Sequence, residues 1–421
     1  MSVVVHNVVS QHVSEVSDLW SQRVVLCGKA QVKLRHLGRW DERIAAHLDG
    51  VAIAGPEAEA FLQASLESVT PGNLFAAAVA ALQARNLDRL QELIALAEAL
   101  PQSRSGLNDA FGWVEPDSLR GLVPRLLQSA VPFHRRLGIT ASARHRVDPG
   151  IAVARRIEDG DPSVRARALR AAGELGLHQM VSSLAAAIQE DDSDCQFWAA
   201  WSAVLLGDRE HALAFLAQLA GTPGELPATR RAIAFQLALQ AMRPKAGHDL
   251  IRRIADEPGS DRHKIRGAGL VGDPVYVPWL IGLMDNDVTA RLAGEAFSLI
   301  TGANLVSLRL ERKASDTVQA GPNDDPEDPN VDMDADEGLP WPDPQRVADW
   351  WAVHEGHFSA GERWFMGSPV TPELCIKVLR HGFQRQRRVA ALHLALTRRG
   401  SVLFEHRAPV TRQIRWLAET G

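Results

Sequence analysis

The chain of 421 residues has an apolar content of 46% and a charged content of 23%, which excludes a chain too polar to fold. Its formal net charge of −5 argues against a protein built mainly to bind nucleic acid or another polyanion. Tyrosine occurs once, whereas alanine and leucine are frequent, so the composition favours helices over sheets.

Residues 1–148 are predicted to form a helical N-terminal region. Short segments with apolar residues at helical spacing recur there, for example at 12–20, 41–48 and 57–66. Glycine and proline separate them, and Gly55-Pro56 is a typical start signal for the third segment.

Residues 149–305 are predicted to form HEAT-like repeats, and their clearest unit is Asp161–Gly176, DPSVRARALRAAGELG. Asp-Pro begins a helix because proline fits the first helical position. Leu169 and Ala172 fall on its apolar stripe, so we expect both to be buried. A single unit of this kind cannot bury its own apolar face, which predicts stacked neighbours and an α-solenoid.

Residues 306–344 are predicted to be an acidic linker or loop. The stretch 315–337 carries nine acidic residues and no lysine or arginine, and it is rich in proline. Such a composition buries too little apolar surface to offset the entropy of ordering. We therefore expect 315–337 to be poorly ordered and sensitive to proteases.

Residues 345–421 are predicted to form a C-terminal helical HEAT-like unit with a basic surface. Arg385, Arg387 and Arg388 are candidate partner-binding residues, and one hypothesis is that the acidic linker screens them until an acidic partner displaces it. Trp350 and Trp351 are candidate aromatic anchors. Because adjacent helical positions face different ways, one of these two tryptophans should lie nearer solvent.

Three patterns resemble ligand sites but lack the context that such sites need. Gly267–Gly272 matches GxGxxG without a preceding strand, which indicates instead a turn between two HEAT helices with small residues for close packing. His354 and His357 have no third metal ligand nearby. The alternating acids of 332–336 lack the glycine and glutamate of a calcium loop at the required positions. The sequence therefore predicts no catalytic, cofactor or metal residues and no enzymatic activity.

The compartment follows from two further observations. No apolar run is long enough to cross a bilayer, and the N-terminus lacks the pattern of a secretory signal, so we expect no membrane insertion. Cys27, Cys195 and Cys375 are widely spaced, as in a cytoplasmic protein with free, buried thiols.

Five segments carry a resemblance to a known family. They are WDERIAAHLDGVAIAG at 40–55, FWAAWSAVLLG at 197–207, AGEAFSLITG at 293–302, LPWPDP with the following Trp-Trp helix at 339–351, and RQRRVAALHLAL at 385–396. Across its whole length the chain resembles the HEAT-like repeat proteins encoded beside bacterial type VI secretion genes. The resemblance implies an accessory role in secretion in the bacterial cytoplasm, and it carries no catalytic or ligand residues with it.

The sequence thus predicts an all-α, HEAT-like α-solenoid that acts as a non-enzymatic scaffold, adaptor or chaperone-like accessory protein. Its expected partner is a protein, such as a secretion-system component or effector, held on an extended surface. The alternative is a nucleic-acid-binding HEAT-repeat protein similar to the alkylpurine DNA glycosylases, which the basic C-terminal region favours and the net charge opposes. A third class, the HEAT-repeat lyases and chaperone-like proteins of cofactor attachment, has only the GLVGDP turn at 269–274 in its favour.

Overall fold

The computed structural model describes residues 5–255, 257, 259–314, 327 and 333–419, and almost all regular structure in them is helical. Two compact units are present. Unit 1 consists of Met1–Gly28, Val32–Leu206 and Arg399–Gly421, and unit 2 consists of Lys29–Gln31 and Gly207–Arg398. Each unit draws on more than one of the four regions predicted from the sequence, because the last residues of the chain belong to unit 1.

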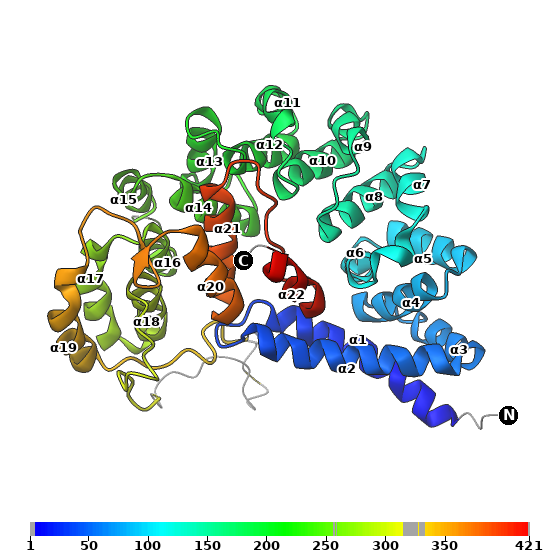
Figure 1. The fold of residues 1–421 in the computed structure, drawn as a ribbon, viewed down its shortest axis with the longest axis horizontal. Coiled ribbons are helices and arrows are strands. Elements are labelled where there is room, and N and C mark those ends of the chain that lie inside the picture. The colour runs from blue at the N-terminus through cyan, green and yellow to red at the C-terminus, as the bar shows by residue number, and fades with distance from the viewer. Residues whose placement is uncertain (1–4, 256, 258, 315–326, 328–332, 420–421) are drawn as a thin grey trace. The chain divides into compact units, whose positions relative to one another are not determined.

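Unit 1 is built from helices joined by short turns (Figure 1). Its helices are α1 (His6–Leu26), α2 (Leu34–Ala54), α3 (Pro56–Ser65), α4 (Pro71–Gln83), α5 (Leu87–Ala99), α6 (Arg104–Trp113), α7 (Leu122–Gln128), α8 (Pro132–His145), α9 (Ile151–Ala154), α10 (Pro162–Glu174), α11 (Val181–Ala187), α12 (Ser193–Leu205) and α22 (Val410–Glu419). Single 3-10 turns cover Pro101–Ser103, Pro116–Leu119, Arg155–Glu158 and His178–Met180.

The helices of unit 1 form two rows. The first row consists of helices that pack one against the next, namely α1, α4, α6, α8, α10 and α12. The second row covers the first and consists of α3, α5, α7, α9 and α11. Small residues allow the close approach within the first row: a Cβ on Gly106 of α6 would lie 1.8 Å from the Pro71 carbonyl oxygen of α4. This two-row packing is the α-solenoid arrangement that the repeat pattern predicts.

The clearest predicted repeat helix forms α10, for the predicted local reasons. The Asp161 side chain accepts hydrogen bonds from the backbone N–H groups of Ser163 and Val164, at 2.9 and 3.2 Å, and Pro162 occupies the first turn. Leu169 and Ala172 are both 0% exposed, so the predicted burial of this stripe is confirmed. Ser202 of α12 donates to the Leu169 carbonyl oxygen at 2.6 Å, which ties the neighbouring repeats together.

Unit 2 continues the same construction and adds a small hairpin (Figure 1). Its elements are α13 (His211–Gly221), α14 (Ala228–Ala241), α15 (Pro244–Arg253), α16 (Asp261–Val271), α17 (Val277–Gly282), α18 (Asp287–Thr301), α19 (Pro344–His354), β1 (Trp364–Phe365), β2 (Ser368–Pro369), α20 (Pro372–His381) and α21 (Gln384–Thr397), with 3-10 turns at Pro274–Tyr276, Leu283–Asp285 and Glu355–His357. Strands β1 and β2 are antiparallel, with Phe365 opposite Ser368.

Helices α14, α16 and α18 pack in succession, whereas α13, α15 and α17 cover them and α20 pairs with α21. The GxGxxG pattern lies in this packing: Gly267 and Gly269 are inside α16, and Gly272 ends it with a φ of 74°. A Cβ on Gly269 would lie 3.1 Å from the Ala296 Cα atom of α18. These glycines serve close packing as predicted, but two of them lie within a helix rather than in a turn.

Hydrogen bonds fix the hairpin and its approach to the helices of unit 2. The Arg363 guanidinium donates to the carbonyl oxygens of Leu239, Met242 and Val271, at 2.7, 2.7 and 3.1 Å. Leu239 and Met242 lie at the C-terminal end of α14, and Val271 is the last residue of α16. Burial lowers the pKa of Arg363 to about 10. The side chain therefore serves as a shared cap for the carbonyl ends of two helices.

The acidic linker is structured in its described parts. Leu310 is buried, and Glu311 pairs with Pro342 in an isolated antiparallel bridge. Asp336 is 3% exposed, so the expectation of disorder is wrong for residues 333–337. Asp334 and Asp336 pair with arginines and Glu337 pairs with Lys29, which composition alone does not reveal. Residues 315–326 and 328–332 lie outside the described residues.

Candidate partner-binding surfaces

Arg385, a predicted partner-binding residue on α21, contacts the acidic turn of residues 333–338. Its Nη1 atom lies 2.8 Å from Glu295 Oε2 and 3.8 Å from Asp336 Oδ1, and its Nη2 atom donates to the Ala335 carbonyl oxygen. The acidic turn therefore contacts Arg385. The hypothesis that the acidic linker screens this arginine requires such a contact.

Two further arginines hold the same turn. Arg262 forms a bidentate ion pair with Asp336, with N–O distances of 2.5 and 2.7 Å. Arg291 contacts Asp334 at 2.6 Å, and its guanidinium lies 4.8 Å from the ring centroid of Trp341. Burial would raise the pKa of Asp336, but the hydrogen bonds and charge of Arg262 hold that pKa below its ordinary value.

Arg387 and Arg388 lie in different environments. Arg387 is 0% exposed, and its guanidinium donates to the Leu379 carbonyl oxygen at 2.7 Å and to the Gln384 side chain. It joins α20 to α21 and offers no charge at the surface, which corrects its assignment as a partner-binding residue. Arg388 is exposed on α21.

Trp350 and Trp351 divide as predicted. Trp351 is 8% exposed and belongs to the core around α17, α18 and α19, whereas Trp350 is partly exposed. Trp350 stacks on His354, with ring centroids 4.0 Å apart, and the His354 Nδ1 atom lies 2.7 Å from the Trp350 carbonyl oxygen. Trp351 thus serves the core, and Trp350 is the tryptophan of the pair that reaches the surface.

The last residues of the chain contact helices of unit 1 that are remote from them in the sequence. We call residues 401–410 the strap. The strap has no regular structure before α22 begins at Val410. The Leu403 N–H group donates to the Glu174 carbonyl oxygen at 3.0 Å, and Arg146 donates to the Leu403 carbonyl oxygen at 2.6 Å. The strap is therefore held by its main chain against the ends of α8 and α10.

A buried ion pair holds the other end of the strap. Arg23 of α1 pairs with Asp41 of α2, and their side chains are 8% and 10% exposed. The Arg23 guanidinium also donates to the carbonyl oxygens of Arg407 and Ala408, each at 3.0 Å. Asp41 accepts the Val410 N–H group at 2.7 Å, which places a carboxylate at the first residue of α22.

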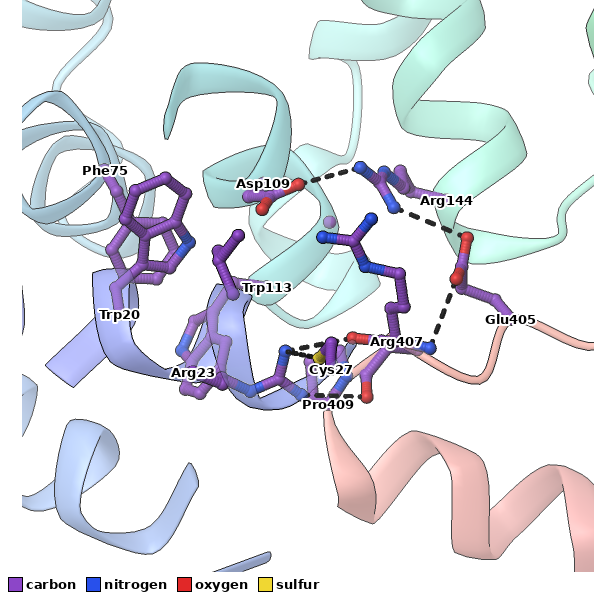
Figure 2. A pocket seen from close by; sticks show the side chains of 13 residues that line it. Trp20, Arg23, Cys27, Phe75, Asp109, Trp113, Arg144, Glu405, Arg407 and Pro409 are labelled. Atoms are coloured by element: carbon purple, nitrogen blue, oxygen red, sulfur yellow. Dashed lines mark hydrogen bonds and ion pairs between the residues drawn. The ribbon is translucent and has the colours of Figure 1, made fainter. Parts of the chain in front are cut away.

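Glu405 is the acidic side chain of the strap, and two arginines of α8 and its C-terminal end face it. Arg144 and Arg146 each lie 3.4 Å from Glu405 Oε2. Arg144 also pairs with Asp109 at 2.8 Å, and Figure 2 shows Arg144 between Asp109 and Glu405. Burial would raise the pKa of Glu405, but Arg146 and Arg144 hold that pKa well below its ordinary value. The site therefore favours an ionised carboxylate.

A small cavity separates the strap from the helices (Figure 2). Its volume is about 30 Å³, enough for one water molecule. Trp20, Phe75 and Trp113 line this cavity, and so do Ala408 and Pro409 of the strap. Trp20 stacks on Phe75 with centroids 5.4 Å apart, and Trp113 meets Phe75 edge-on at 5.7 Å. These three rings, which we call the aromatic surface, thus line the same cavity as the proline of the strap.

Two further arginines of the basic C-terminal region, both on α22, make contacts within unit 1. Arg412 is 4% exposed and donates to the carbonyl oxygens of Gly112 and Val114 at 2.6 and 2.9 Å, at the end of α6. Arg415 pairs with Glu115 at 3.0 Å. These two arginines therefore attach α22 to the end of α6 and the residues that follow it, which the sequence pattern did not indicate.

Unit 1 is expected to lose stability in acid because of Glu174. Burial would raise its pKa, but Arg167 and Arg170, both 2.8 Å away, lower that pKa from 4.5 to about 2. A carboxylate with a depressed pKa stabilises the folded state above its unfolded pKa, and this contribution is lost as the pH falls from about 4.5 towards 2. Thermal melts of Glu174→Gln should show a weaker pH dependence over this range than the wild-type chain. The same change at exposed Glu57 should leave the dependence unaltered.

The described residues contain no group of three or more histidine, cysteine or acidic side chains placed to hold a metal ion. Asp334 and Asp336 bind arginines, while Asp332 lies outside the described residues. Cys27, Cys195 and Cys375 are free and buried, as predicted. Every helix of the described part is too short or too polar to span a bilayer.

Comparison with known proteins identifies one family. Residues 151–226 match the family of HEAT repeats, and this segment contains α10, α11 and α12. No curated protein and no solved structure matches the chain. The HEAT-like repeat predicted around Leu169 is thereby confirmed.

Proposed function

We propose that this HEAT-repeat chain is a non-enzymatic scaffold or adaptor that binds extended acidic segments of partner proteins. HEAT repeats commonly serve protein interaction, because stacked helices offer a long surface without a deep pocket. Two segments of the chain itself, one in each unit, show what kind of partner segment such a surface would bind.

The observation that carries the proposal is one mode of recognition used in both units. In unit 2, Arg262, Arg291 and Arg385 hold the carboxylates and a carbonyl oxygen of the acidic turn at 333–338. In unit 1, Arg23, Arg144 and Arg146 hold the carbonyl oxygens and the carboxylate of the strap. Guanidinium groups suit this task because they present several donors in a fixed plane and stay charged.

The resemblance to proteins encoded beside type VI secretion genes suggests the setting. We propose an accessory or chaperone-like role in the bacterial cytoplasm, with a secretion-system component or effector as partner. Support comes from the HEAT repeats at 151–226 and from the segments that carry the resemblance.

Affinity purification of the tagged chain from its native cells, followed by mass spectrometry, tests this function. We expect a secretion component to be enriched at low salt and reduced at high salt, because exposed charges are screened. The variant Arg388→Glu should lower its recovery several-fold, since a rim charge mainly affects the association rate. Arg398→Glu places the same charge change at another exposed position and is the matched control.

Three results would count against parts of the proposal. Enrichment of other proteins alone would leave a scaffold without the secretion role. Salt-dependent recovery of nucleic acid alone would favour the nucleic-acid-binding alternative. Equal recovery of the partner protein by the Arg388→Glu and Arg398→Glu variants would show that Arg388 does not belong to the binding surface.

A further inference from the structure

We infer that the face of unit 1 beneath the strap is a binding site for an extended, proline-containing acidic segment of a partner protein, which the strap occupies in cis. This inference rests on the proposed scaffold function and specifies its site and the chemistry of its partner. Three kinds of observation support it. They are the hydrogen bonds that hold the main chain of the strap, the side chains of the strap that the site contacts, and the cavity that the strap leaves unfilled.

The first argument is recognition through the main chain. Leu403 exchanges hydrogen bonds with Glu174 and Arg146 through its N–H and carbonyl groups, and Arg23 binds two further carbonyl oxygens. The Val410 N–H group completes the set by donating to Asp41. Main-chain groups are common to every sequence, so an extended segment of a different protein would meet the same donors and acceptors.

The second argument is a requirement for one carboxylate. Arg144 and Arg146 converge on Glu405, and the Arg146 side chain is only 5% exposed. A neutral residue at this position would leave a largely buried guanidinium without its counter-ion, which is costly. A partner segment therefore needs an acidic residue that faces these two arginines.

The third argument is the aromatic surface four residues further along. Ala408 and Pro409 line the same cavity as Trp20, Phe75 and Trp113, and the Arg23 guanidinium lies 5.5 Å from the Trp113 ring centroid. Proline suits such a surface because it is rigid and loses little entropy on binding. The partner motif is thus an acidic residue followed, four positions later, by proline.

The fourth argument is that the strap is an incomplete occupant. It leaves a cavity of about 30 Å³ that the aromatic surface lines, and its Val402 is 46% exposed. Arg412 of α22 anchors the chain beyond the strap independently, through Gly112 and Val114. Release of the strap would break the hydrogen bond from Gln413 to the Ala408 carbonyl oxygen and the contact of Phe404 with Trp416, but it would leave these Arg412 contacts of α22 in place.

The experiment uses the full chain and a fluorescent peptide of residues 399–412 as the probe. The wild-type chain should bind the probe weakly, because a tethered strap competes at an effective concentration in the millimolar range. The variant Glu405→Arg places a third cation beside Arg144 and Arg146 and so expels its own strap while leaving the site intact. Fluorescence anisotropy should show at least about a tenfold gain in affinity for the probe.

Glu419→Arg is the matched control, since it makes the same charge change at an exposed position of α22. It should bind the probe as the wild type does. Probes that carry Glu405→Gln or Pro409→Ala should bind the Glu405→Arg chain more weakly than the wild-type probe. Equal affinity of the wild-type, Glu405→Arg and Glu419→Arg chains would overturn the inference.

Thermal melts guard against loss of folding. If the Glu405→Arg chain is destabilised, excess probe should raise its melting temperature, because a ligand that binds only the folded state stabilises it. The milder Glu405→Gln chain provides a second variant, and failure of the probe to stabilise either one would also refute the site. A secretion component that still co-purifies when the probe does not bind would leave the scaffold function standing and the site wrong.

Discussion

The Ala172→Arg variant is expected to lose the cooperative unfolding transition of unit 1. Ala172 is 0% exposed on α10, which packs against α8 and α12, so an arginine there would bury its charge. An unpaired buried charge costs several kcal/mol or more, which is comparable to the whole stability of a domain. Circular dichroism melts and size-exclusion chromatography measure the loss.

Two companion variants sharpen this prediction. Leu169→Ala should cost about 2–5 kcal/mol through cavity formation, or about 2–4 °C of melting temperature per kcal/mol in a unit of this size. Ala186→Arg introduces the same side chain at an exposed position of the adjacent helix α11 and should melt as the wild type does. An unchanged melting temperature for Ala172→Arg would show that the repeat packs in another register.

The Asp41→Ala variant is expected to lose about 3–5 kcal/mol of stability and to release the N-terminal end of α22. Asp41 neutralises the buried Arg23 and accepts the Val410 N–H group, so its removal leaves an uncompensated charge and an unpaired donor. Denaturant melts measure the first effect. Faster hydrogen exchange of the Val410 amide measures the second.

Asp49→Ala is the control for this variant, because Asp49 lies exposed on the same helix α2. A loss of stability as small as that of the control would contradict the role assigned to the Arg23–Asp41 pair. Loss of stability without faster exchange at Val410 would mean that the ion pair stabilises α1 and α2 but not the strap.

Local patterns in the sequence were sufficient for the repeat helices. The spacing of Leu169 and Ala172, together with Asp161-Pro162, predicted both the start of α10 and the face that it buries. These features depend on residues within a few turns of one another. The same holds for the division between Trp350 and Trp351, which follows from the geometry of a single helix.

The arginines could not be sorted in the same way, because their partners are distant in the sequence. Arg387 and Arg388 are neighbours of the same type, yet one is buried and the other is exposed. Arg23 binds carbonyl oxygens 384 and 385 positions away. The sequence around an arginine does not show whether its side chain faces water or a carbonyl oxygen. No local sequence pattern could therefore predict the strap or its site.

The order in which unit 1 becomes complete during synthesis follows from its discontinuous chain. Helices α1 to α12 emerge from the ribosome first, but residues 399–419 arrive only after the whole of unit 2. Until then Arg23 and Asp41 lack the carbonyl and N–H groups that they bind, and the aromatic surface of Trp20, Phe75 and Trp113 lacks its cover. Contacts that join such remote segments form slowly, because closing a long loop costs entropy before any contact stabilises it. The nascent chain therefore passes through a stage at which the face proposed to bind a partner is uncovered, because the strap that occupies it has not yet been synthesised.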